Sequence, residues 1–163
     1  MSNLETEHYT VGPTPTGHAI RFLRIETTKL LVERWGEGDD RPSWFDGREG
    51  LTSVTIAPHP KREISVQISV QSGSAEVKAA VACDMAVYYE VAVDGELVED
   101  ASEFLASMSE KKAAAVANRG IHDLSPSVRE AVLSATARVL PERPLALPVP
   151  LGMISDNKMT WHP

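Results

Sequence analysis

The sequence predicts an α+β fold, with a four-stranded antiparallel sheet followed by two helices packed on one of its faces. Residues 64–70 and 77–93 alternate apolar with other side chains, which is the period of two that strands require. Helical signals occur only after residue 93. Strands that precede helices in this way are typical of an antiparallel sheet rather than a doubly wound parallel one.

A hairpin forms the predicted centre of the sheet. Its first arm alternates β-branched residues with serine and glutamine, which gives one apolar and one polar face from Ile64 to Val70. The turn is expected at Ser72-Gly73-Ser74, because glycine accepts a positive φ. The return arm, 77–93, has a long apolar side that must be covered by the later helices or by a second subunit. Cys83 lies on that side and is interpreted as a buried hydrophobe; it is the single cysteine, which excludes an internal disulfide.

The N-terminal half is predicted to contain an arm, two strands and a loop. Residues 1–18 are interpreted as a flexible arm, and residues 19–154 as one domain. A strand is expected at 19–35 with a bulge near Thr27-Thr28, where the apolar residues change face, and a short strand at 53–57. The glycine-rich loop at 36–50 carries Trp44 and Phe45 and follows Trp35. These aromatic residues either fold back onto the core, which is the commoner case, or face a partner.

Two helices are predicted in the C-terminal half. Asp100 followed by Glu103 has the spacing of a capping box, and Gly120 is the expected C-terminal stop of that helix. The second helix is expected to begin with Ser125 as its cap and Pro126 at its first position, and to end at residue 141. Residues 141–150 are then expected to be extended and held by their leucines. Residues 155–163 are expected to form a frayed tail.

Composition narrows the class of function. The net charge is −7 and the 16 basic residues are dispersed, which argues against nucleic-acid binding. The longest apolar run is far below the roughly 20 residues of a membrane span, and no secretory signal is visible. With a single cysteine, the cytoplasm is the expected compartment. The five histidines lack metal-ligand spacing, and no nucleophile elbow or phosphate-binding loop is present. We therefore predict no catalytic site, no metal and no cofactor.

Residues 124–149 resemble the C-terminal region of the SecB export chaperone family. In that family a Leu-Phe-Pro-Tyr-Ala-Arg-Glu segment opens a helix and a Leu-x-Pro-Val stretch follows. Here the corresponding segments read Leu-Ser-Pro-Ser-Val-Arg-Glu and Leu-Ala-Leu-Pro-Val, and the agreeing residues are Pro126, Arg129, Glu130, Pro148 and Val149. Ser125 and Ser127 replace the usual aromatics, and the final helix of the family is not evident. The order of elements is also similar, and the loop with Trp44 falls where the family has a crossover loop carrying a tryptophan.

The resemblance implies a divergent SecB-like chaperone, of the kind associated with toxin–antitoxin pairs or encoded by phages. Such a protein acts without ATP and binds non-native polypeptide or a dedicated client, such as an antitoxin or a preprotein. It would self-associate as a dimer or tetramer, and the SecA translocation ATPase is a candidate partner. The predicted client contacts are Trp35, Trp44 and Phe45, against the helix at 126–140, with Met153 and Ile154 extending the groove. Residues assigned to structural or subunit contacts are Pro126, Arg129, Glu130 and Val132.

Two other interpretations remain open. The first is a non-enzymatic phage or accessory protein whose aromatic loop recognises one folded partner. The second is a small-molecule enzyme, which would need a deep pocket with a perturbed ionisable group.

Overall fold

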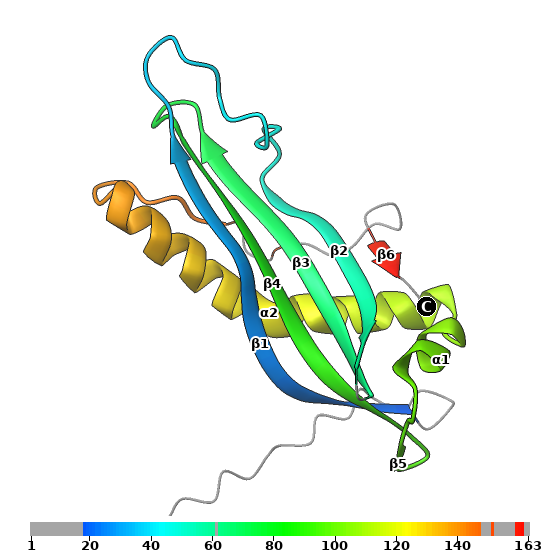
Figure 1. The fold of residues 1–163 in the computed structure, drawn as a ribbon. Coiled ribbons are helices and arrows are strands. Elements are labelled where there is room, and N and C mark those ends of the chain that lie inside the picture. Colours follow the sequence, from blue (N-terminus) through cyan, green and yellow to red (C-terminus); the bar gives the residue numbers. More distant parts are fainter. Residues whose placement is uncertain (1–17, 61, 148–150, 152–158, 162–163) are drawn as a thin grey trace, which may run out of the picture.

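The computed structural model describes residues 18–60, 62–147, 151 and 159–161. It shows a twisted sheet with a long helix lying across one face (Figure 1). The strands are β1 (His18–Arg34), β2 (Gly50–His59), β3 (Glu63–Ser74), β4 (Ala79–Val93), β5 (Glu96–Leu97) and β6 (Met159–Trp161), and the helices are α1 (Ala101–Ala106) and α2 (Glu110–Val139). The order across the sheet is β1-β4-β3-β2-β6, with β5 paired to β4.

The predicted α+β fold is confirmed: long antiparallel strands come first, and two helices follow them. Strand β1 has register shifts at Phe22/Arg24 and Thr27/Lys29, and the second of these matches the predicted bulge. The hairpin turn is displaced from its predicted position, because β3 continues through Ser74 and Gly73 pairs with Ala80. The turn lies instead at residues 75–78, where Lys78 adopts a positive φ of 49°.

The core lies between the sheet and α2. Strands β2, β3 and β4 supply most of the buried apolar residues of the sheet, Ile20 of β1 is also buried, and α2 contributes a buried stripe. That stripe consists of Ala113, Ala117, Gly120, Ile121, Leu124, Val128, Val132 and Thr136. At its middle the Tyr89 hydroxyl donates to Asp123 (2.7 Å), which also accepts from Arg119 (2.9 Å), so a polar network joins β4 to α2.

The predicted helix boundaries at Gly120 and Ser125 are wrong. Helix α1 begins as expected at the Asp100 cap, whose carboxylate accepts the Ser102 N–H (2.8 Å), but it ends at Ala106. Helix α2 then runs without interruption from the Ser109 cap to Val139. The Ser125 hydroxyl donates back to the Ile121 carbonyl (2.6 Å), as serine does inside helices. Pro126 also lies inside the helix, where proline favours a bend, and Figure 1 shows α2 bent near its middle.

The segment after α2 is pinned by its leucines as predicted. Leu145 and Leu147 are buried, and the buried Thr136 hydroxyl bonds both the N–H (3.0 Å) and the carbonyl (3.1 Å) of Leu145. Part of the tail that we expected to be frayed forms β6, which pairs in parallel with β2. The predicted arm lies outside the described residues up to position 17, and His18 begins β1. No helix among the described residues is long and apolar enough to cross a membrane.

Candidate functional site

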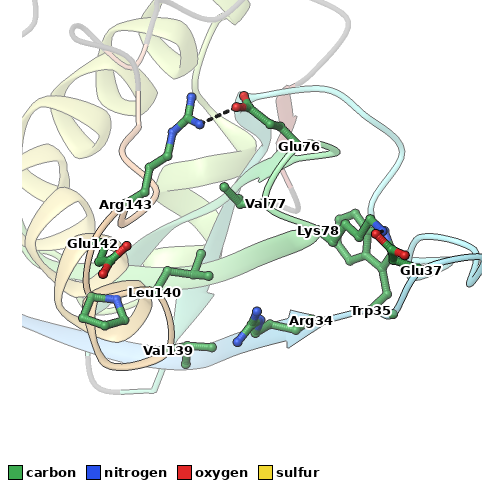
Figure 2. Close-up of a pocket in the computed structure, with 12 residues that line it drawn as sticks. Arg34, Trp35, Glu37, Glu76, Val77, Lys78, Val139, Leu140, Glu142 and Arg143 are labelled. Carbon is green, nitrogen blue, oxygen red and sulfur yellow. Dashed lines mark hydrogen bonds and ion pairs between the residues drawn. The ribbon is translucent and has the colours of Figure 1, made fainter.

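A groove of about 740 Å³ lies at one end of the sheet, where three distant segments meet. We call it the Trp35 groove. The end of β1 provides one side, the β3–β4 turn another, and the end of α2 with the following turn provides the third (Figure 2). Its lining residues are Arg34, Trp35, Gly36, Glu37, Glu76, Val77, Lys78, Val139, Leu140, Pro141, Glu142 and Arg143.

The apolar residues of the Trp35 groove are only partly covered by the rest of the chain. Trp35, Val77, Val139 and Leu140 are half-buried, and Pro141 is exposed. Val77 and Leu140 also pack against the main core, which gives this surface a firm support. Trp35 is held at the backbone by its N–H, which donates to the Lys78 carbonyl (3.0 Å). The groove therefore offers a fixed patch of accessible apolar surface.

The charged residues around the groove are balanced in sign. Its cationic side chains are Arg34, Lys78 and Arg143, and its anionic ones are Glu37, Glu76 and Glu142. Two ion pairs join them across the segments, Arg143–Glu76 at 2.6 Å and Lys78–Glu37 at 3.5 Å. The hydrogen bond from the Arg143 side chain lowers the pKa of Glu76. Both ion pairs are largely exposed, and pairs of this kind contribute little to stability.

Side-chain hydrogen bonds hold the loop at 36–49 on the face of the sheet opposite α2. The indole N–H of the half-buried Trp44 donates to Glu33 of β1 (2.8 Å), and Gln71 of β3 donates to Asp46. Asp46 also accepts from the Arg48 side chain (2.6 Å). That bond is the main reason why the pKa of Asp46 falls to about 2. These contacts hold the loop across two strands.

Phe45 is the buried anchor of this loop. Its ring is 6% exposed and lies over Gly73 of β3. A Cβ at position 73 would lie 2.5 Å from the Phe45 Cε1 atom, so only glycine leaves room for the ring. Phe45 therefore folds back onto the sheet, which was one of the two alternatives for this loop.

The predicted site residues are only partly brought together. Trp35 lines the groove beside the end of α2, whereas Trp44 and Phe45 are not among the lining residues. Met153 and Ile154 lie outside the described residues. On α2, Val132 is fully buried in the core, Arg129 is half-buried, and Pro126 and Glu130 are exposed.

Sequence reasoning missed the other apolar residues of the groove. The sequence places Val77 in a strand, and Val139, Leu140 and Pro141 at the end of a helix. The sequence holds only a weak signal for them. Leu140 lies at a helix end next to proline, and Val77 lies beside a charged turn, so that neither has an evident cover. The resemblance implies that Trp35 lies against the helix at 126–140, whereas nothing in the sequence places Val77 beside them.

Comparison with known proteins gives matches at the level of structure. A Mycobacterium tuberculosis SecB-like chaperone, solved in complex with a ChAD peptide from an antitoxin, is 20% identical with a TM-score of 0.49 and covers 80% of this chain and 90% of its own. A Streptococcus agalactiae protein of unknown function is 13% identical with a TM-score of 0.46, covering 80% of this chain and 98% of its own. No family model and no curated protein matches the sequence. At these identities the likeness concerns the general fold and assigns no function to this chain.

Proposed function

We propose that this protein is an ATP-independent, SecB-like chaperone that holds non-native polypeptide in the Trp35 groove. The observation that carries the proposal is an accessible apolar floor surrounded by side chains of balanced charge. Exposed apolar patches with polar edges are typical of surfaces that bind other proteins.

The lining of the groove favours polypeptide over a small ligand. Its apolar members are Trp35, Val77, Val139, Leu140 and Pro141, all supplied by side chains on a wide, open surface. Three cations and three anions on the edge give no preference for a ligand of one sign. Such a surface suits apolar segments with varied flanking charges, which is what unfolded clients present. A dedicated client, such as an antitoxin, would use the same surface.

Self-association is the second part of the proposal. Strand β1 is the outermost strand on its side of the sheet, and among the described residues no strand pairs with its outer edge, which can therefore take another strand. Phe22 and Leu30 of β1 are 39% and 45% exposed, which leaves apolar surface beside that edge. We propose that a second copy covers it, and light scattering of the intact chain tests this directly. A monomer across the concentration range of the holding assay would contradict it.

The client site is tested by aggregation of a reduced, unfolded client with and without the protein, in the absence of nucleotide. The Trp35→Ala variant is expected to lose at least about 2 kcal/mol of client binding, or about 30-fold in affinity, as tryptophan does at binding hot spots. Leu97→Ala is the control, because Leu97 is also an accessible apolar residue, 43% exposed, and lies on β5, outside the groove. Figure 1 shows β5 at the end of the sheet opposite the β3–β4 turn.

Equal protection by the parent and by Trp35→Ala would refute the assignment of the groove. Indifference to every unfolded client, together with a one-to-one complex with a folded protein, would favour the accessory interaction protein instead.

A further inference from the structure

We propose that the outer edge of β2 is a second polypeptide-binding site, which the chain's own strand β6 fills in this structure. Strand β2 pairs with β3 on one side and with β6 on the other, where Val54, Thr55 and Ile56 align in parallel with Met159, Thr160 and Trp161. Figure 1 shows β6 beside β2 and away from the β3–β4 turn. This edge is a different surface from the Trp35 groove, and the proposal does not depend on that groove.

Among the described residues, β6 is the one strand that pairs with the outer edge of β2, and it pairs with only part of that edge. Strand β2 has ten residues, and the pairing with β6 covers only three of them, residues 54–56. The N–H and C=O groups along a sheet edge are a template for an added strand, and several proteins bind extended peptides in this way. A longer extended segment can therefore pair with more of the edge than β6 does. Pro58 lacks an N–H and limits the pairing toward the end of β2.

The burial of β2 defines what kind of segment fits. Val54 and Ile56 are fully buried on the side that faces the core, whereas Thr55 between them is half-buried on the other side. Aligned residues of neighbouring strands share a face of the sheet. An occupant at 54–56 therefore needs the order apolar, polar, apolar. The residues of β6 follow this order, and Thr160 is exposed.

Strand β6 acts in this proposal as a competitor within the same chain. A segment that is part of the same chain has a higher effective concentration at the edge than a separate peptide at micromolar concentration. A separate peptide with the same intrinsic affinity is then excluded at micromolar concentration. The β2 edge becomes available when β6 is released, or when a segment that pairs with more of β2 displaces β6.

The test measures binding of a fluorescein-labelled peptide with the sequence of residues 157–162, by fluorescence anisotropy. The Thr160→Pro variant of the full chain is expected to bind it at least about tenfold more tightly than the parent, because proline disfavours strand pairing and releases the edge. Thr160→Ala is the matched control, since it keeps the backbone N–H, and it should bind like the parent. A chain shortened after Lys158 is a second route to the same state. A peptide with proline in place of its threonine should not bind.

Equal binding of the peptide to the parent, Thr160→Pro and the shortened chain would overturn the proposal. Hydrogen exchange on the Thr160→Pro variant locates the peptide. Added protection at residues 54–56 supports the β2 edge, and protection confined to Val77 and Val139 overturns it. The two proposals fail independently: Trp35→Ala tests the groove in the aggregation assay, and it should leave peptide binding to Thr160→Pro unchanged.

Discussion

Replacing Phe45 by alanine is expected to loosen the loop at 36–49 and to destabilise the fold. The ring is 6% exposed and rests on Gly73. Phenylalanine-to-alanine changes in cores cost about 3–5 kcal/mol. We expect the lower end, about 3 kcal/mol, because a loop at the end of a sheet relaxes around the space more easily than a central core does.

The contact with Gly73 makes this prediction specific. In Gly73→Ala the new methyl group would overlap the Phe45 ring, and overpacking of this kind costs about 1–3 kcal/mol. In the double variant the ring is absent and the methyl group has space. The double variant should therefore be about 2 kcal/mol more stable than additive single effects would make it.

Urea unfolding of the parent, both single variants and the double variant measures this coupling. Client holding is measured on the same samples, with Trp35→Ala alongside. We expect Trp35→Ala to lose client binding with a small loss of stability, and Phe45→Ala to lose stability first. Additive single effects would show that the ring and Gly73 are not in contact. A Phe45→Ala variant of parental stability that no longer binds client would show instead that Phe45 contacts the client.

Three further predictions concern packing, a buried hydrogen bond and pH. Gly120→Ala places a Cβ 2.6 Å from the Val66 Cβ atom. The overlap should cost about 1–3 kcal/mol, which exceeds the gain of about 1 kcal/mol in helix propensity, so we expect a lower Tm. A raised Tm would contradict the close packing of α2 on β3. Tyr89→Phe removes one of the two side-chain donors to Asp123 that the described residues provide, and it should lower the free energy of unfolding by about 1–2 kcal/mol. An unchanged urea midpoint would count against this network. The pKa of Asp46 is lowered from 3.8 to about 2, first by its bond with the Arg48 side chain, so its stabilising effect is present above the unfolded value and is lost as pH falls toward about 2. The stability difference between the parent and Asp46→Asn should therefore be constant above that window and shrink within it, whereas a difference that grows on acidification would refute the role of Asp46.

The sequence predicted the elements whose signals are local. The alternation in β3 and β4 identified two strands, the change of face near Thr27 identified a bulge in β1, and Asp100 was identified as a helix cap. Each of these features depends only on residues that are close together in the chain, because strand alternation and helix capping act over a few residues.

Glycine and serine were misassigned because their local and tertiary roles look alike in a sequence. Gly120 has the signature of a helix stop, but it is required where α2 approaches Val66. Gly73 has the signature of a turn, but it makes room for the Phe45 ring. Ser125 before Pro126 has the signature of a helix start, yet its hydroxyl bonds to Ile121 within α2. For the two glycines the deciding neighbour belongs to another part of the chain, whereas for Ser125 it is Ile121, in the preceding turn of the same helix.

By itself the sequence determined the fold class, strands β1, β3 and β4 and the first helix cap, whereas β2 is longer than the strand predicted at 53–57. Tertiary structure decided which aromatic residue is buried, that α2 is one helix, and which residues join Trp35 in a groove. The physical reason is that periodicity and capping act over a few residues. The groove, in contrast, needs the ends of β1 and α2 and the β3–β4 turn to meet, and their proximity follows from sheet register and helix packing.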